Sequence, residues 1–414
     1  MNKKVNIFKS RPILVGSLTL LVLSMCSYHL LIRIGFNQSG LIALTALIVF
    51  LSLVKEIKEF LYDSLEAPRK YFFTLCVLFF SFTGVIFNFE NILEIGLFII
   101  LFFSIYLIFI NQNNDLNNFI TNLMIYSGIF MSIGVLIGLF ESMFLSSKLF
   151  YHTWDIYPYI GQRFLYSGFG ANHNFSAFII VIAQSFLFLS TSVFMKNLRI
   201  YLTVLFLLAL LITGTKIAVL FISLAICNYF LKDKFKKNLM NIILIALYLF
   251  ASHIVISFHD SYELGTTHYR ELLFSIGDLD FILGSYGYTK VAYFIELKNH
   301  FFLPVNVKDI AQTVNADPHS LIYSLIILGG FPLAFSVVVF LVKGIYKNFR
   351  LIQKNYPNYY FCGLISIITE TFLWDSNNSI FFWIIILYAV TLSKNSFSSD
   401  NSPTISASDG TLTT

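Results

Sequence analysis

The stretch ADPHSLIYSLIILGG, which begins at Ala316, holds the residue whose type and position best fit catalysis. Asp317 suits the N-cap of a helix and Pro318 suits its first position, so the stretch predicts a helix start. A helix start alone does not account for His319, because the helix dipole disfavours a protonated imidazole there. The same field keeps the imidazole neutral near pH 7 and able to accept a proton. We therefore expect His319 to be a general base, with Asp317 beside the substrate.

Three cations are candidates for binding an anion. Lys216 stands in LLITGTKIAVLFISL, where one apolar run turns into the next, and a lysine flanked by apolar residues is costly in a membrane. The TGT before it offers backbone and hydroxyl donors to the same anion. Arg270 in TTHYRELLFSIG and Arg163 in IGQRFLYSGFGANHNFS are the other two. The patterns also allow Lys216 to snorkel to the headgroups, and Arg270 to be a solvated loop charge or a partner of Glu271.

Polar and aromatic residues near these cations could contact a substrate. The Gly- and Asn-rich stretch that contains Arg163 ends in Asn172, His173 and Asn174 before an apolar run, and such amides can bind a polar ligand. An ordinary loop with a helix start near Asn174 is the alternative. Tyr286, in ILGSYGY, could stack on a sugar face, although tyrosines are also common at membrane interfaces.

The composition places these residues in a membrane protein. Of the 414 residues, 57% are hydrophobic and only 12% are charged, whereas soluble domains are about 45–50% apolar and about 25% charged. The net charge of +5 does not indicate a nucleic-acid partner. The four cysteines fall inside apolar runs and no histidine spacing fits a metal site, so we expect no disulfide, metal or cofactor.

Apolar runs recur along the chain at lengths that suit membrane crossing, since a span needs about 20 residues. We predict an all-α, polytopic helical bundle of about 12 transmembrane helices. The spans are placed near 12–32, 40–54, 71–88, 92–110, 119–140, 175–195, 200–213, 217–231, 239–258, 320–342, 359–373 and 378–393.

The distribution of lysine and arginine predicts the orientation, because positive residues favour the cytoplasmic side. Clusters occur before the first span and in alternate connections after it, so we expect both termini in the cytoplasm. The connections 141–174 and 259–318 then lie outside. In the second of these, YRELLFSIGDLDFIL is expected to form short amphipathic helices at the interface. Every candidate above falls on this outer side.

The chain is therefore expected to have four parts. They are an N-terminal membrane bundle of about nine spans (1–258, with the periplasmic loop 141–174), a large periplasmic loop (259–318), C-terminal spans (319–393) and a cytoplasmic tail (394–414). The Ser- and Thr-rich composition of the tail predicts disorder.

The order of these motifs resembles that of the O-antigen polymerase/ligase superfamily of bacterial lipid-linked polysaccharide enzymes. The similar features are a cation at a span mouth (Lys216), a long outer loop with HYRELLF and ILGSYGY, and DPHSLIYSLIILGG opening the next span. The detailed similarity covers about 210–335, and GANHNFSAF is similar to a Gly- and Asn-rich stretch of many members. Many members have Arg in place of Lys216 and Asn in place of Ser320, and a lysine lacks the bidentate fork that arginine presents to phosphate.

The resemblance implies a GT-C-like bundle that transfers glycans at the periplasmic face of the bacterial inner membrane, without a metal. The donor would be a glycan on undecaprenyl diphosphate, bound through Lys216, Arg270 and Arg163. His319 would take the proton of the attacking sugar hydroxyl, which favours inversion at the anomeric carbon. Membrane lipids and a chain-length regulator would be further partners.

Three functions stay open at this point. A polymerase, which we favour, joins lipid-linked repeat units to one another, whereas an O-antigen ligase transfers the finished glycan to lipid A-core. A flippase or transporter for the same glycan is the third, but transporters tend to carry charges near the membrane midplane and internal repeats. The charge in this chain gathers at the outer mouth instead.

Overall fold

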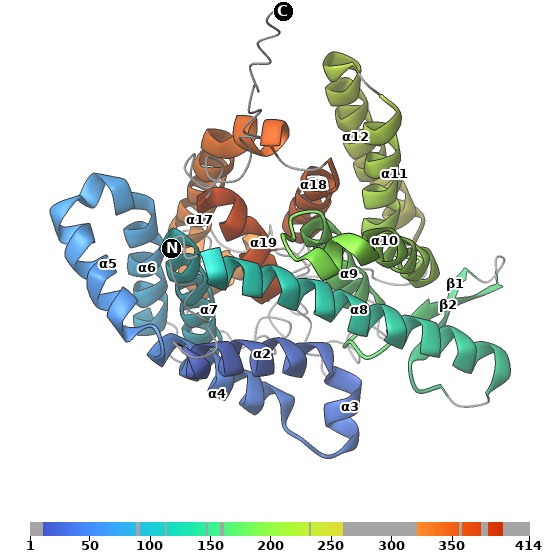
Figure 1. Cartoon of the computed structure of the whole chain (residues 1–414), viewed down its shortest axis with the longest axis horizontal. Helices are drawn as coiled ribbons and strands as arrows, with labels where there is room; N and C mark the ends of the chain where they lie inside the picture. The colour runs from blue at the N-terminus through green and yellow to red at the C-terminus, as the bar shows by residue number, and fades with distance from the viewer. Residues whose placement is uncertain are drawn as a thin grey trace, which may run out of the picture.

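The computed structural model describes residues 11–87, 92–111, 114–145, 148–157, 161–231, 233–259, 321–355, 358–373 and 380–391. Most of these residues are helical, as the apolar runs predict. Figure 1 shows the helices packed together, with one small β-hairpin beside them.

Each predicted span overlaps a helix of the structure. The helices are α2 (Pro12–Cys26), α3 (Tyr28–Arg33), α4 (Gln38–Leu51), α5 (Val54–Glu66), α6 (Pro68–Phe87), α7 (Ile92–Ile110), α8 (Asn114–Phe144), α9 (His173–Leu187), α10 (Val193–Thr213), α11 (Lys216–Phe230), α12 (Lys234–His259), α17 (Leu321–Asn355), α18 (Asn358–Leu373) and α19 (Ile380–Thr391).

Three details differ from the predicted spans. The first span is divided at Ser27 between α2 and α3, and α5 occupies the connection 55–70, where hydropathy indicated no span. Helix α17 is broken at Gly329 and Gly330, and Gly330 has a φ of 74°. Pro332 follows the break, and because proline lacks a backbone N–H it cannot restore the regular hydrogen bonding there.

Within the described ranges, three helices are long and apolar enough to cross a membrane: α8, α10 and the part of α17 from Leu328 to Asn348. The bent pair α4–α5 makes a fourth if it is counted as one span. Five further apolar helices are shorter, among them α9 and α11. The structure thus contains helices suited to a membrane, and the number of 12 spans stays a prediction.

A two-stranded hairpin lies between α8 and α9, in the connection 141–174. Strand β1 (Tyr151–Tyr157) pairs antiparallel with β2 (Gly161–Tyr166), with Tyr151 opposite Tyr166. The ring of Tyr151 lies 6.2 Å from that of Tyr166, and such cross-strand aromatic pairs stabilise a short hairpin. The predicted all-α class therefore has this one exception in the part of the chain that the structure describes.

One end of the bundle, which we call the hairpin end, carries the hairpin together with the end of α2 and the start of α9. The backbone N–H of His29, near the start of α3, donates to the carbonyl of Phe169, just before α9, at 3.2 Å. The N–H of Gly168 donates to the carbonyl of Phe150, just before β1, at 3.0 Å. The sequence assigned all these segments to the outer side, so their contacts agree with that assignment.

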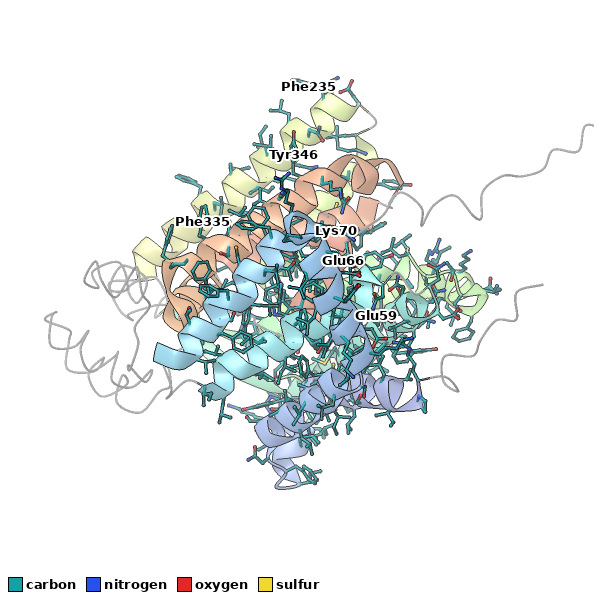
Figure 2. All side chains as sticks on the ribbon, turned by 90° about the vertical axis from the view of Figure 1, so that its left-hand side faces the viewer. Glu59, Glu66, Lys70, Phe235, Phe335 and Tyr346 are labelled. Atoms are coloured by element: carbon teal, nitrogen blue, oxygen red, sulfur yellow. The ribbon has the colours of Figure 1, made fainter. Side chains whose placement is uncertain are left out.

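The opposite end brings together segments that the sequence assigned to the cytoplasm. Thr191, before α10, donates to Asn118 near the start of α8 at 3.2 Å. Figure 2 shows Phe235 on α12, Tyr346 on α17 and Lys70 on α6 one below another, from the top of the view towards its middle. The grouping of the basic connections on one side, and with it the orientation in a membrane, stays a prediction.

The centre of the bundle is formed by α9 and α19. Figure 1 shows them between α7 and α17 on one side and α10 and α11 on the other. All residues of α9 from Ser176 to Leu187 are buried. On α19, the ring of Trp383 packs edge-on against Phe98 and Phe102 at 5.6 and 5.0 Å. Close packing along its length fixes the position of α9, and it therefore also fixes the position of the residues at its start.

Candidate functional site

The start of α9 presents three of the predicted substrate-binding residues at the hairpin end. Asn172 is the N-cap, and its side-chain oxygen accepts a hydrogen bond from the N–H of Phe175 at 2.7 Å. His173 and Asn174 are the first two helical residues, and both are half-buried. The alternative raised by the sequence, a helix start at this point, is thus confirmed. A capped start still leaves helix N–H groups and two polar side chains at the surface of the bundle.

The loop before α9, residues 167–171, is fixed by contacts with other elements. The Ser167 hydroxyl lies 3.3 Å from Nε2 of His29 and also donates to the carbonyl of Phe150. The ring of Phe169 packs against Phe130 of α8 at 4.6 Å. The hydroxyl of Ser176 donates back to the carbonyl of Ser167. The Gly-rich approach that the sequence singled out is therefore a firmly held loop.

A buried carboxylate at the end of α8 holds the start of the hairpin. Glu141 is 2% exposed and accepts hydrogen bonds from the backbone N–H groups of Leu149 at 2.8 Å and Phe150 at 2.7 Å. Hydrogen bonds to an ionised acceptor are stronger than neutral ones, so Glu141 ties the hairpin to the bundle. Through Phe150 it also supports the loop before α9.

Gly168 is the position in this loop that tolerates a side chain least. Its φ is 56°, and a Cβ would lie 2.7 Å from backbone atoms of Gly134 and Val135 on α8. We expect Gly168→Ala to destabilise the fold by about 2–5 kcal/mol, from backbone strain plus overpacking. The measurement is the thermal unfolding midpoint of the purified protein in detergent.

Two other glycines serve as matched controls for that substitution. Gly35 has a φ of 74° but open space around it, so Gly35→Ala carries the strain without the clash. At Gly170 the Cβ would meet side-chain atoms rather than backbone: the flexible end of Met131 at 2.5 Å, the Ser176 hydroxyl at 2.7 Å and the Phe175 ring at 3.3 Å. The midpoint should fall furthest for Gly168→Ala. An equal fall for Gly35→Ala would contradict the close fit of the loop on α8.

Lys216 is the first residue of α11 and is exposed. Helix α10 ends at Gly214 in a left-handed conformation, with φ of 60°, and Thr215 caps α11 by accepting from the N–H of Ala218 at 3.3 Å. The TGT motif is thus the tight turn between two helices. Because α10 begins beside the start of α8 and contacts β2, this turn lies at the hairpin end.

The two helix starts belong to neighbouring, parallel helices. Both α9 and α11 begin at the hairpin end, they contact each other, and each also packs against α10 and α18. The positive ends of two helix dipoles therefore point towards the same side of the molecule, and Lys216 adds a full charge. Such an arrangement favours an anionic ligand.

The remaining predicted residues are described in part or not at all. Arg163 lies on β2, opposite Trp154 of β1. The structure describes its backbone but not its side chain. Arg270, Tyr286, Asp317 and His319 lie outside the described residues, as does the amphipathic stretch predicted in the same loop. Helix α17 begins at Leu321, close to the helix start that Asp317 and Pro318 predict.

Glu370 on α18 is a candidate that sequence reasoning missed. Its side chain is 5% exposed, and the hydroxyl of Tyr248 on α12 donates a hydrogen bond to its carboxylate. An ionisable residue inside an apolar bundle is costly, and such residues usually have a function. In the sequence, Glu370 appears as a single acidic residue near the end of the predicted span 359–373. An acidic residue at that position is easily interpreted as the polar end of the span.

The hairpin end therefore combines two helix starts, an exposed lysine and half-buried polar side chains. No family model, curated protein or solved structure matches the chain. The functional conclusion must accordingly come from the residues and their arrangement.

Proposed function

We propose that the chain is a glycosyltransferase that polymerises undecaprenyl-diphosphate-linked repeat units into O-antigen or a related surface polysaccharide. The reaction takes place at the hairpin end, on the periplasmic side of the bacterial inner membrane. The proposal is supported by the motif order around Lys216, Arg270 and His319, and by the presence of helices suited to a membrane.

The observation that carries the proposal is the position of Lys216 at the first residue of α11. A helix N-terminus disfavours a cation by about 0.3–1 kcal/mol, so a lysine here opposes the local field. An anion bound at this point would be stabilised by both the lysine and the dipole. A diphosphate is the anion that a lipid-linked glycan donor brings to a membrane surface.

The reaction follows from these roles. A hydroxyl oxygen of the acceptor sugar attacks the anomeric carbon of the donor, and the bond from that carbon to the phosphate oxygen breaks. The hydroxyl proton goes to His319, and undecaprenyl diphosphate leaves with the bonding electrons. Lys216, Arg270 and Arg163 stabilise the charge that develops on the leaving diphosphate. Asn172, His173, Asn174, Tyr286 and Asp317 orient the sugars.

The species that accumulates in a deletion strain tests the proposal. Loss of the gene should leave surface core glycan with a single repeat unit, because ligation continues while polymerisation stops. Full-length glycan held on the lipid carrier would instead show an O-antigen ligase. Single units held on the cytoplasmic face would show a flippase, and an unchanged ladder of chain lengths on a gel would refute all three.

A further inference from the structure

Helix α5 is inclined to the neighbouring helices α4, α6, α7 and α17. It follows α4 after a short break at which the chain bends by 60°. Figure 2 shows α6, α7 and α17 running in one direction and α5 crossing it steeply. If those helices cross a membrane, α5 does not run parallel to them through it.

One arc of α5 is fixed to the bundle. Glu56, Phe60 and Ser64 recur every four residues and are buried. The ring of Phe60 packs edge-on against Tyr71 at 5.1 Å and Phe103 at 5.0 Å, and Glu56 forms an ion pair with Arg11. This arc sets the rotation of α5, so the other residues face defined directions.

The outward surface of α5 divides into an apolar flank and a polar flank. Val54, Leu61 and Leu65, spaced by seven and four, share one side of the helix and are exposed. Glu59 and Glu66, labelled in Figure 2, share the other side. Bundle, apolar flank and polar flank follow one another around the helix, which is the pattern expected where protein, lipid and water meet.

Lys58 marks the boundary between the two flanks. It is exposed and stands three residues before Leu61 and seven before Leu65, at the edge of the apolar flank. A lysine in this position can lay its aliphatic stem along lipid and reach a phosphate with its ammonium group. Arg69 and Lys70, also exposed, follow at the connection to α6.

We propose that α5 lies in the headgroup region of the cytoplasmic leaflet and docks the bundle on phospholipid. Val54, Leu61 and Leu65 enter the acyl chains, Lys58 lies at the level of the phosphates, and Glu59 and Glu66 face the cytosol. Entry of the leucines into the acyl chains removes apolar surface from water, which stabilises this position. This docking surface is independent of the reaction proposed above.

Lipid is the occupant that the neighbouring surface favours. Helix α6 contacts α5 and exposes Phe72, Phe79 and Phe82, so an apolar surface continues on the adjacent helix. The mixture of leucines, a boundary lysine and flanking acids is typical of an interfacial helix, whose two sides meet different media. The alternative geometry, in which α4 and α5 form one broken span, would place Glu59 and Glu66 in hydrocarbon at high cost.

Thiol labelling of the full-length protein in inside-out membrane vesicles tests this placement. Leu65→Cys and Glu59→Cys are compared with a membrane-impermeant maleimide, and the unmodified chain gives the background from its four helical cysteines. We expect Glu59→Cys to react at least about tenfold faster, because a thiol among acyl chains neither ionises nor meets the reagent. Both positions are on the surface, so both variants should fold.

Without a membrane, the exposed fractions of the two side chains predict that Leu65→Cys labels no more slowly than Glu59→Cys. Leu65 is 82% exposed and the Glu59 side chain 57%, so a helix in water would label at least as fast at Leu65. That result would overturn the proposal. Slow labelling at both positions would show a broken span, and labelling only from the periplasmic face would show the opposite orientation; either overturns it as well. In a spin-labelled Leu65→Cys protein, faster relaxation by dissolved oxygen than by a water-soluble nickel chelate would support it.

Discussion

A strain that produces His319→Ala in place of the original chain should make surface glycan with a single repeat unit and no longer chains. A positioned general base contributes about 10²–10⁴-fold to a reaction rate, so its removal should lower polymerisation below detection on a gel. The measurement is the ladder of chain lengths, together with the amount of the protein in the membrane fraction. An unchanged ladder would refute the general-base role.

A second substitution separates proton transfer from positioning. His319→Asn keeps a polar side chain of similar reach, but its amide cannot accept a proton at neutral pH. We expect the same loss as for alanine. Full activity of His319→Asn would mean that the residue orients the sugar and that the proton goes elsewhere. Because α17 begins at Leu321, the comparison also shows whether substitutions at this start affect protein level.

Hydropathy predicted the positions of the helices well but not the elements between them. An apolar run dictates a helix wherever backbone groups must be satisfied without water, so α6, α8 and α11 lie where the runs do. Helix α5 escaped prediction because only one arc of it, around Phe60, is buried, so its mean hydropathy is low. The hairpin was not predicted because each of its strands is stabilised by pairing with the other. It is also held by the hydrogen bond from the N–H of Leu149 to Glu141, eight residues earlier.

Individual candidate site residues were predictable where their chemistry is unusual for their sequence position. Lys216 stood out because a cation beside apolar residues is costly, and the structure places it at the start of a helix. Asn172 was predictable as a capping residue from its type alone. Glu370 could not be predicted as a candidate from the sequence. What marks it out is its burial and the hydrogen bond from the Tyr248 hydroxyl on another helix, and a single sequence shows neither.

Lys216→Ala should abolish polymerisation, whereas Lys216→Arg should keep most of it. Removing one preorganised donor to a developing anion lowers a rate by about 10²–10³-fold. Arginine keeps the charge at the first residue of α11 and adds the bidentate geometry that suits phosphate. Glycan chain length in a complemented deletion strain measures both variants, and activity of Lys216→Ala equal to that of the original chain would refute a diphosphate role.

Lys216→Met and Lys55→Ala are the matched controls. Methionine keeps the length of the side chain without its charge, so loss of activity in Lys216→Met assigns the effect to electrostatics rather than packing. Lys55 is also an exposed lysine, but it lies on α5 and not at either of the two helix starts, so Lys55→Ala should leave the glycan unchanged. The amount of Lys216→Met in the membrane and its thermal unfolding midpoint show whether the fold tolerates the loss of the charge. A protein that folds at least as well and yet does not polymerise would show that Lys216 is retained for its ligand.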